Sequence, residues 1–152
     1  MAFSRDTDSG TVEYGGTIGG TSFNYGDTFY NLTISSATWA PASIPTIDND
    51  LTVTGGMLDL SHFTAGVTVN GFTLTGGTFR STAGILSITD TTLISGGTFD
   101  HNNGTVQFLG ENDYSITTGS ASFWNVIFNK TGGISKTITL LDDMTVLNDL
   151  TV

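Results

Sequence analysis

A pair of glycines returns at nearly constant spacing in the middle of the chain, each time inside the same short phrase. The phrase reads LTVTGGMLD, then FTLTGGTFR, then TLISGGTFD. The first glycines of the three pairs, Gly55, Gly76 and Gly96, are 21 and 20 residues apart. A unit that recurs at a fixed period of this length is typical of stacked repeats, in which each unit packs on its neighbours instead of around one globular core.

A longer repeat is superposed on the short one. When the sequence is shifted by 94 residues, 9–36 lies over 103–130 without a gap, and FYNL from Phe29 meets FWNV from Phe123. With a slip of one residue the similarity continues, so that 9–58 and 103–152 are related copies. We therefore interpret the whole chain, 1–152, as one repeat domain, and we expect it to be a segment of a longer array.

Composition and local pattern both predict an all-β fold. The chain has 20 glycines and only two prolines, many threonines, and short runs in which apolar and polar residues alternate. A parallel β-helix explains why the same glycine corner returns, because every coil turns there and lies on the coil before it. We predict a right-handed parallel β-helix, or β-solenoid, of about seven coils with roughly 20 residues per coil. Two inward columns should stack along it: Val53, Leu74, Ile94 and Leu58, Phe79, Phe99.

Asparagine is expected to stack as well. Asn31 and Asn125 fall at the same place in the two long repeats. We expect them to occupy equivalent corners, where amide side chains can bond to one another along the axis.

Charge restricts the partners. Fourteen acidic residues against four basic ones give a net charge of −10. This balance disfavours binding to nucleic acid or to an anionic membrane surface. No stretch is long and apolar enough to be inserted in a bilayer, and the chain has no cysteine.

Several runs of the chain resemble the repeats of a known class of proteins. The run GTFDHNNGTVQFLG, followed by SFWNVIFNKTGG and ITLLDDMTVLNDLTV, resembles the repeats of very large bacterial surface and secreted proteins, the haemagglutinin-like and autotransporter-like β-helical adhesins. FYNLTI from Phe29 matches the same repeats, and the resemblance is weakest over 35–47. It implies an extracellular or cell-surface location and a structural or adhesive role as a stalk, shaft or fibre.

The ends of such a coil expose strand edges that recruit other chains. Two explanations for strand-like ends compete: the segment is cut from a longer protein, which we favour, or copies pair end to end as a homopolymer.

Further alternatives for the function are a module that binds a host or environmental glycan, a polysaccharide-processing enzyme, and an ice-binding protein that uses Thr52, Thr54, Thr73 and Thr75. We expect no catalytic residues.

Four residues are candidates for binding. Asp59, Arg80 and Asp100 should stack one coil apart as an acid, base, acid ladder, which is either part of a site or a surface ladder that neutralises itself. Trp39 lies beside Pro41 in an irregular insertion, where we expect an exposed aromatic that contacts a partner.

No cofactor is expected, with calcium as the one ion to consider. Asp48, Asp50, Asp142 and Asp143 fall at corners that should be equivalent, and carboxylate oxygens suit calcium. The simpler interpretation is that these aspartates accept backbone hydrogen bonds at turns. His62 and His101 lie in loops of different coils and predict no metal site.

Overall fold

The computed structural model describes residues 9–16, 28–130 and 136–152, and among them it contains strands and turns but no helix. All strand pairs are parallel, and the strands form four sheets. Sheet A contains β1 (Thr11–Tyr14), β3 (Asn31–Ile34), β6 (Leu51–Val53), β9 (Phe72–Leu74), β12 (Thr92–Ile94), β15 (Tyr114–Thr117) and β17 (Ile138–Leu140). Sheet C contains β4 (Thr38–Trp39), β7 (Met57–Asp59), β10 (Thr78–Arg80) and β13 (Thr98–Asp100).

The third wall of the coil consists of two sheets. Sheet D contains β8 (Val67–Val69), β11 (Ile85–Ile88), β14 (Thr105–Gly110), β16 (Ser122–Lys130) and β18 (Thr145–Thr151). Sheet B contains β2 (Thr28–Phe29) and β5 (Thr46–Ile47), and it continues the same wall, because β5 lies beside β8. No helix in the described part of the chain could serve as a membrane span.

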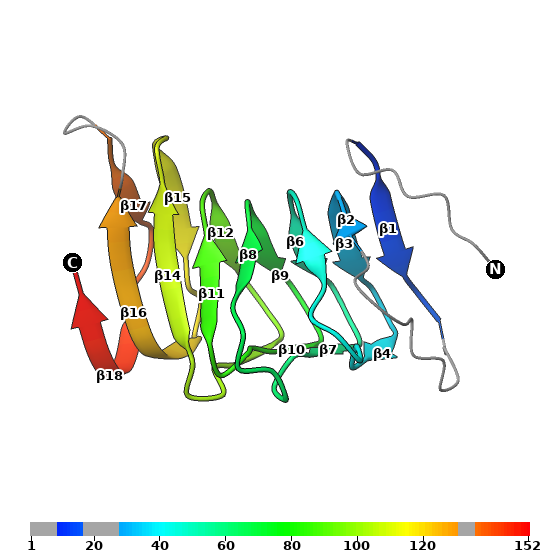
Figure 1. Cartoon of the computed structure of the whole chain (residues 1–152). Helices are drawn as coiled ribbons and strands as arrows, with labels where there is room; N and C mark the ends of the chain where they lie inside the picture. Colours follow the sequence, from blue (N-terminus) through cyan, green and yellow to red (C-terminus); the bar gives the residue numbers. More distant parts are fainter. Residues whose placement is uncertain (1–8, 17–27, 131–135) are drawn as a thin grey trace.

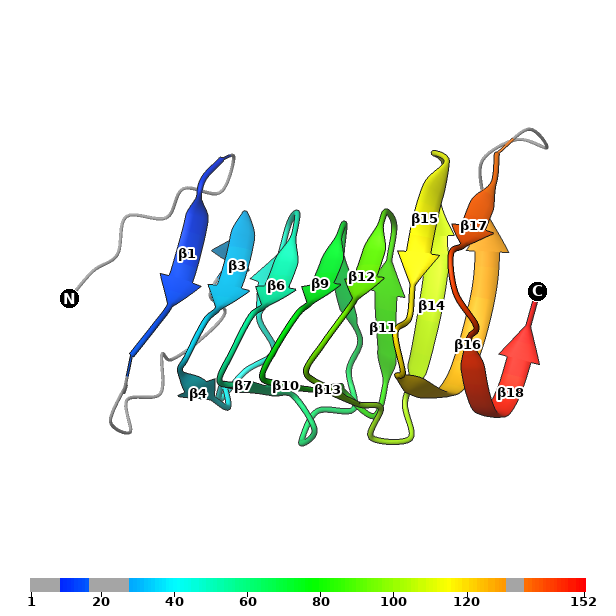
Figure 2. The ribbon, with the colours of Figure 1, turned by 180° about the vertical axis from the view of Figure 1, so that it is seen from behind.

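The chain coils in a right-handed sense. Figure 2 shows the strands of sheet A running down the near side, and Figure 1 shows sheet D rising on the opposite side while the chain advances from one end to the other. The stack has about six turns of roughly 20 residues, against the seven coils expected from chain length. The predicted right-handed parallel β-helix is confirmed.

The two predicted inward columns are confirmed. Val53, Leu74 and Ile94 are in register in sheet A, and Leu58, Phe79 and Phe99 are in register in sheet C. Five of the six are buried, and Phe99 is partly exposed. Each coil thus places like residues on like residues, and one hydrophobic core runs along the axis.

The glycine pairs form the corner between sheets A and C. The first glycine of a pair has no room for a side chain, and the second also has a backbone conformation that disfavours one. A Cβ on Gly76 would lie 2.4 Å from the carbonyl oxygen of Thr54 in the preceding coil. Gly77 has a φ of 68°, which L side chains rarely adopt, and its Cβ would also lie 2.5 Å from backbone atoms of Gly55 and Gly56. The corner therefore requires glycine because coils stack closely there.

The 94-residue repeat keeps its strand register but changes sheet. Strands β1 and β3 pair Thr11 with Asn31 in sheet A, and β14 and β16 pair Thr105 with Asn125 in sheet D. A shift of 94 is not a whole number of coils of this length, so the second copy is rotated about the axis. Asn31 and Asn125 are thus equivalent in their pairing, although they lie on different walls.

Trp39 contradicts its prediction as an exposed binding residue. Its side chain is 5% exposed, its ring stacks on Tyr14 with centroids 4.9 Å apart, and it meets Phe29 edge-on at 6.1 Å. The three rings pack in the core near the N-terminal end of the stack. The free energy gained by burying the large apolar ring exceeds the cost of leaving the Trp39 Nε1 atom without a hydrogen-bond partner.

Candidate functional site

The predicted acid, base, acid ladder forms on the outer face of sheet C. Arg80 pairs in register with Asp59 on one side and Asp100 on the other. Arg80 Nη1 lies 3.3 Å from Asp59 Oδ2, and Arg80 Nε lies 3.4 Å from Asp100 Oδ2. The guanidinium stands between the two carboxylates, so the carboxylates do not face each other across a sugar-sized space.

Asp59 is held further by its own turn. Its Oδ1 accepts hydrogen bonds from the Ser61 hydroxyl and the Ser61 backbone N–H, at 2.6 and 2.9 Å. Partial burial raises the pKa of Asp59, but the Ser61 hydrogen bonds and Arg80 together lower that pKa below its ordinary value. Asp59 is therefore a stable anion at neutral pH, which suits a structural role better than acid catalysis.

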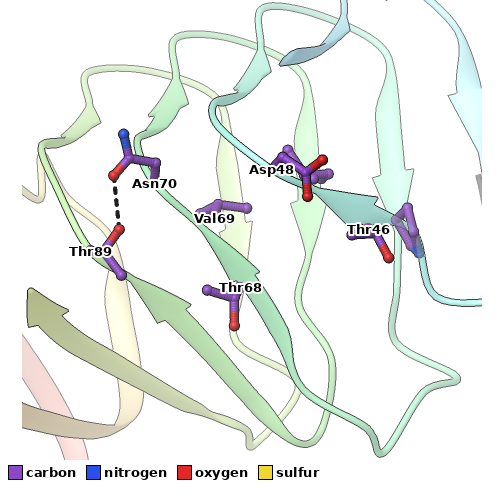
Figure 3. Close-up of a pocket in the computed structure, with 8 residues that line it drawn as sticks. Thr46, Asp48, Thr68, Val69, Asn70 and Thr89 are labelled. Carbon is purple, nitrogen blue, oxygen red and sulfur yellow. Dashed lines mark hydrogen bonds between the residues drawn. The ribbon is translucent and has the colours of Figure 1, made fainter. Parts of the chain in front are cut away.

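Asp48 lies at an open groove of about 440 Å³ where sheets B and D meet (Figure 3). Besides Asp48, the lining consists of three threonines, three apolar residues and Asn70, and Thr89 Oγ1 donates a hydrogen bond to Asn70 Oδ1 over 2.8 Å. Asp48 is the one carboxylate among the residues that line it. This groove lacks the several oxygen anions that a calcium ion prefers.

Of the other predicted calcium ligands, Asp50 and Asp142 accept hydrogen bonds from backbone N–H groups, and Asp143 accepts one through its own backbone carbonyl. Asp50 Oδ1 accepts from Gly71 N at 3.0 Å. Asp142 Oδ1 accepts from Thr118 N and Oγ1, its Oδ2 accepts from Gly119 N, and the Asp143 carbonyl accepts from Thr118 Oγ1. Across 9–16, 28–130 and 136–152, no three Asp, Glu, His or Cys side chains gather to hold a metal.

The corners of Asp48 and Asp142 are not equivalent, contrary to prediction. Asp48 follows β5 in sheet B, whereas Asp142 follows β17 in sheet A. The hydrogen bonds from Thr118 N and then Gly119 N, with partial desolvation opposing them, lower the pKa of Asp142. Its role in the structure is to fix the turn at 118–119.

The threonine array predicted for ice binding is short. Thr52 pairs with Thr73, and Thr33 extends the column by one coil. Leu93 then takes the next position and is 37% exposed. The flat hydroxyl surface is therefore interrupted after three coils.

A cleft of about 560 Å³ lies where sheet C ends. Residues 119–122 of the next coil cross above β13 without pairing with it, although sheets A and D continue through the same layer. Phe99 lines the cleft together with Asp100, His101 and hydroxyl groups from Thr98, Ser120 and Ser122.

His101 is oriented by two contacts. Its Nδ1 accepts a hydrogen bond from Asn103 N at 2.9 Å, and its ring stacks on Trp124 with centroids 5.8 Å apart. Asn102 and Asn103 both have positive φ, 48° and 55°, and Asn102 Nδ2 donates to Ser61 O, 41 residues earlier. The loop that carries His101 is thus held in an uncommon backbone conformation.

The sequence did not predict this cleft. One signal was present: no glycine pair follows Gly96-Gly97 at the next step of about 20 residues. Thr92 in β12 is 13 residues before its sheet D counterpart Thr105, whereas in the next coil Ile116 is only nine residues before Asn125. This shorter connection, in which Ala121 N donates to Thr118 O, contains no strand of sheet C.

A second unusual surface is the C-terminal end of the stack. Leu140 is 46% exposed and Leu150 is 57% exposed, although their in-register neighbours Ile116 and Val126 are fully buried. Strands β17 and β18 are the last of sheets A and D, so their outer edges pair with no described strand.

Comparisons of the chain with protein-family models, curated proteins and solved structures find no match.

Proposed function

We propose that this chain is a structural β-solenoid, a shaft element that lengthens when a further parallel coil stacks on its C-terminal end. The exposure of Leu140 and Leu150 carries the proposal. Both occupy inward positions, and because about half of each side chain is still exposed, covering it contributes about 1 kcal/mol per leucine.

The partner that fits best is the β1 end of a second copy. Strands β1 and β17 are the two edges of sheet A, and every neighbouring pair in that sheet is parallel. A copy displaced along the axis would therefore continue the sheet with the same polarity. Val12 in β1 is 43% exposed although its neighbour Leu32 is fully buried, so within the described ranges both edges of sheet A have an exposed inward residue. Such a head-to-tail contact generates a filament.

The surface chemistry of sheet C supports a shaft over a polysaccharide-processing enzyme. Asp59 and Asp100 are engaged by the same arginine and do not form a facing pair. The resemblance to haemagglutinin-like and autotransporter-like repeats supports a bacterial surface location and an adhesive context for the shaft.

Light scattering and negative-stain electron microscopy over a concentration series test the proposal. Wild-type protein should form filaments whose length increases with concentration, and added salt should promote them by screening the net charge of −10. Leu150→Glu should give short rods, because a carboxylate would be buried at the junction. Leu93→Glu is the matched control on the side wall and should assemble like wild type. Monomeric rods at every concentration, or equal assembly of both variants, would contradict the proposal.

A further inference from the structure

We propose that the cleft between β13 and residues 119–122 binds a neutral saccharide. The cleft lies in the side wall of the stack, where Figure 2 shows β13 as the last strand of its row. The site is separate from the end-on contact proposed above, so either proposal can fail alone.

The floor of the cleft is an aromatic side chain that remains partly exposed. Leu58 and Phe79, which stack in the same column, are fully buried, but Phe99 is only partly buried. Its ring packs against Phe72, Phe79 and Phe123, with centroids 6.1, 5.7 and 5.1 Å away, which holds it in place. The exposed part of this fixed aromatic side chain is a suitable surface for the C–H groups of a sugar ring.

The backbone of Phe99 supplies a donor and an acceptor at the same place. In a parallel ladder, successive residues direct their peptide groups to opposite neighbours. Thr98 N bonds to Gly77 O, and Asp100 O accepts from Ser81 N, both toward β10. The N–H and C=O of Phe99 therefore point toward the cleft, where no described strand pairs with β13.

The rim adds polar groups whose directions are fixed. Asp100 Oδ1 accepts from Asn102 N at 3.1 Å, and Asp100 Oδ2 contacts Arg80. Because Nδ1 of His101 accepts a hydrogen bond, the neutral imidazole carries its proton on Nε2, which is a donor. With the hydroxyls of Thr98, Ser120 and Ser122, the cleft offers several donors and acceptors around one apolar face.

This arrangement favours a hydroxylated, uncharged ligand over two others. An anionic ligand would meet Asp100 and a protein of net charge −10, while the nearby Arg80 is already shared by two carboxylates. An added peptide strand would find only the Phe99 peptide groups free on a three-residue strand. A sugar needs one aromatic face and scattered polar contacts.

The test uses Trp124 as the reporter, since its indole stacks on His101. Maltotriose, cellotriose and chitotriose are titrated separately into the full chain up to about 10 mM, and tryptophan fluorescence is recorded. Trp39 is buried in another part of the stack, so a saturable change arises from Trp124. At least one of the three probes should give such a change.

Two variants locate the site, with binding measured by calorimetry. His101→Ala and Asp100→Asn should each lower the affinity for the responding saccharide by about tenfold, which corresponds to about 1.4 kcal/mol of binding free energy. Asp48→Asn, which alters the other groove, should bind like wild type. Circular dichroism confirms that all variants keep the fold. No saturable response to any of the three saccharides, or an equal loss in Asp48→Asn, would overturn the proposal.

Discussion

Asn148 Nδ2 donates a hydrogen bond to Asn125 Oδ1 over 2.8 Å, and Asn49 makes the same contact to Asn31 at the same distance near the other end of the chain. In both places the backbone N–H of the next residue, an aspartate, donates to the same asparagine oxygen: Asp149 N to Asn125 at 3.3 Å and Asp50 N to Asn31 at 3.2 Å. Asn125 and Asn31 in turn donate to a threonine hydroxyl of the preceding coil, Thr105 and Thr11 respectively, each over 3.4 Å. The expected stacking of amides is thus confirmed at two places, one on sheet D and one on sheet A.

Removal of an amide should cost more in the interior of one ladder than at the end of the other. Asn49 lies between Asn31 and Asn70, so Asn49→Ala leaves two partly buried amide groups without their partner and should lower the free energy of unfolding by about 2 kcal/mol. Asn148 is exposed, and Asn148→Ala should cost about 0.5 kcal/mol. Urea denaturation compares the two. Equal losses would show that the ladder does not act as a continuous chain of hydrogen bonds.

A methyl group at the glycine corner should be poorly tolerated. Gly77→Ala combines an unfavourable positive φ with contact to backbone atoms at 2.5 Å, and it should cost about 3 kcal/mol or more. Gly16 also has a positive φ, 87°, but nothing lies within 4 Å of its Cβ position. Gly16→Ala should therefore cost only the conformational term, about 1 kcal/mol. Thermal unfolding of both variants separates crowding from backbone strain.

The turn at 118–119 should depend on pH through Asp142. The pKa of Asp142 is lowered in the folded protein, so its stabilising effect is present above the ordinary aspartate pKa of about 3.9 and is lost as pH falls through the lowered value. Asp142→Asn should be less stable than wild type at pH 7. The two urea midpoints should converge as the pH falls toward 2. A gap that stays constant with pH would contradict the role given to this carboxylate.

Trp39 should behave as a core residue. Trp39→Ala removes a ring packed between Tyr14 and Phe29 and should lower the free energy of unfolding by about 3–5 kcal/mol. Acrylamide should quench Trp39 less than the partly exposed Trp124, which can be measured in Trp124→Phe and Trp39→Phe proteins. Efficient quenching of Trp39 would restore the prediction of an exposed aromatic.

The sequence predicts the parts of this fold that repeat. The glycine corners impose the coil, and the spacing between them gives the register that stacks Asp59, Arg80 and Asp100. The position of Trp39 does not follow from its irregular segment, because its burial depends on Tyr14 from the preceding coil and on Phe29 from another wall of its own coil. The cleft beside Phe99 likewise depends on one missing strand pair, and its only sign in the sequence is that the glycine pair does not recur after Gly96-Gly97.

The change of sheet between the two long repeats affects how such a rod displays its surface. Because 94 residues is not a whole number of turns, the pairing of Thr11 with Asn31 and that of Thr105 with Asn125 face different directions around the axis. If this unit were duplicated again with the same phase, equivalent outer groups would follow a spiral instead of a straight row. A flat partner would then meet them on one side only at intervals, whereas a partner that wraps the rod could engage each of them.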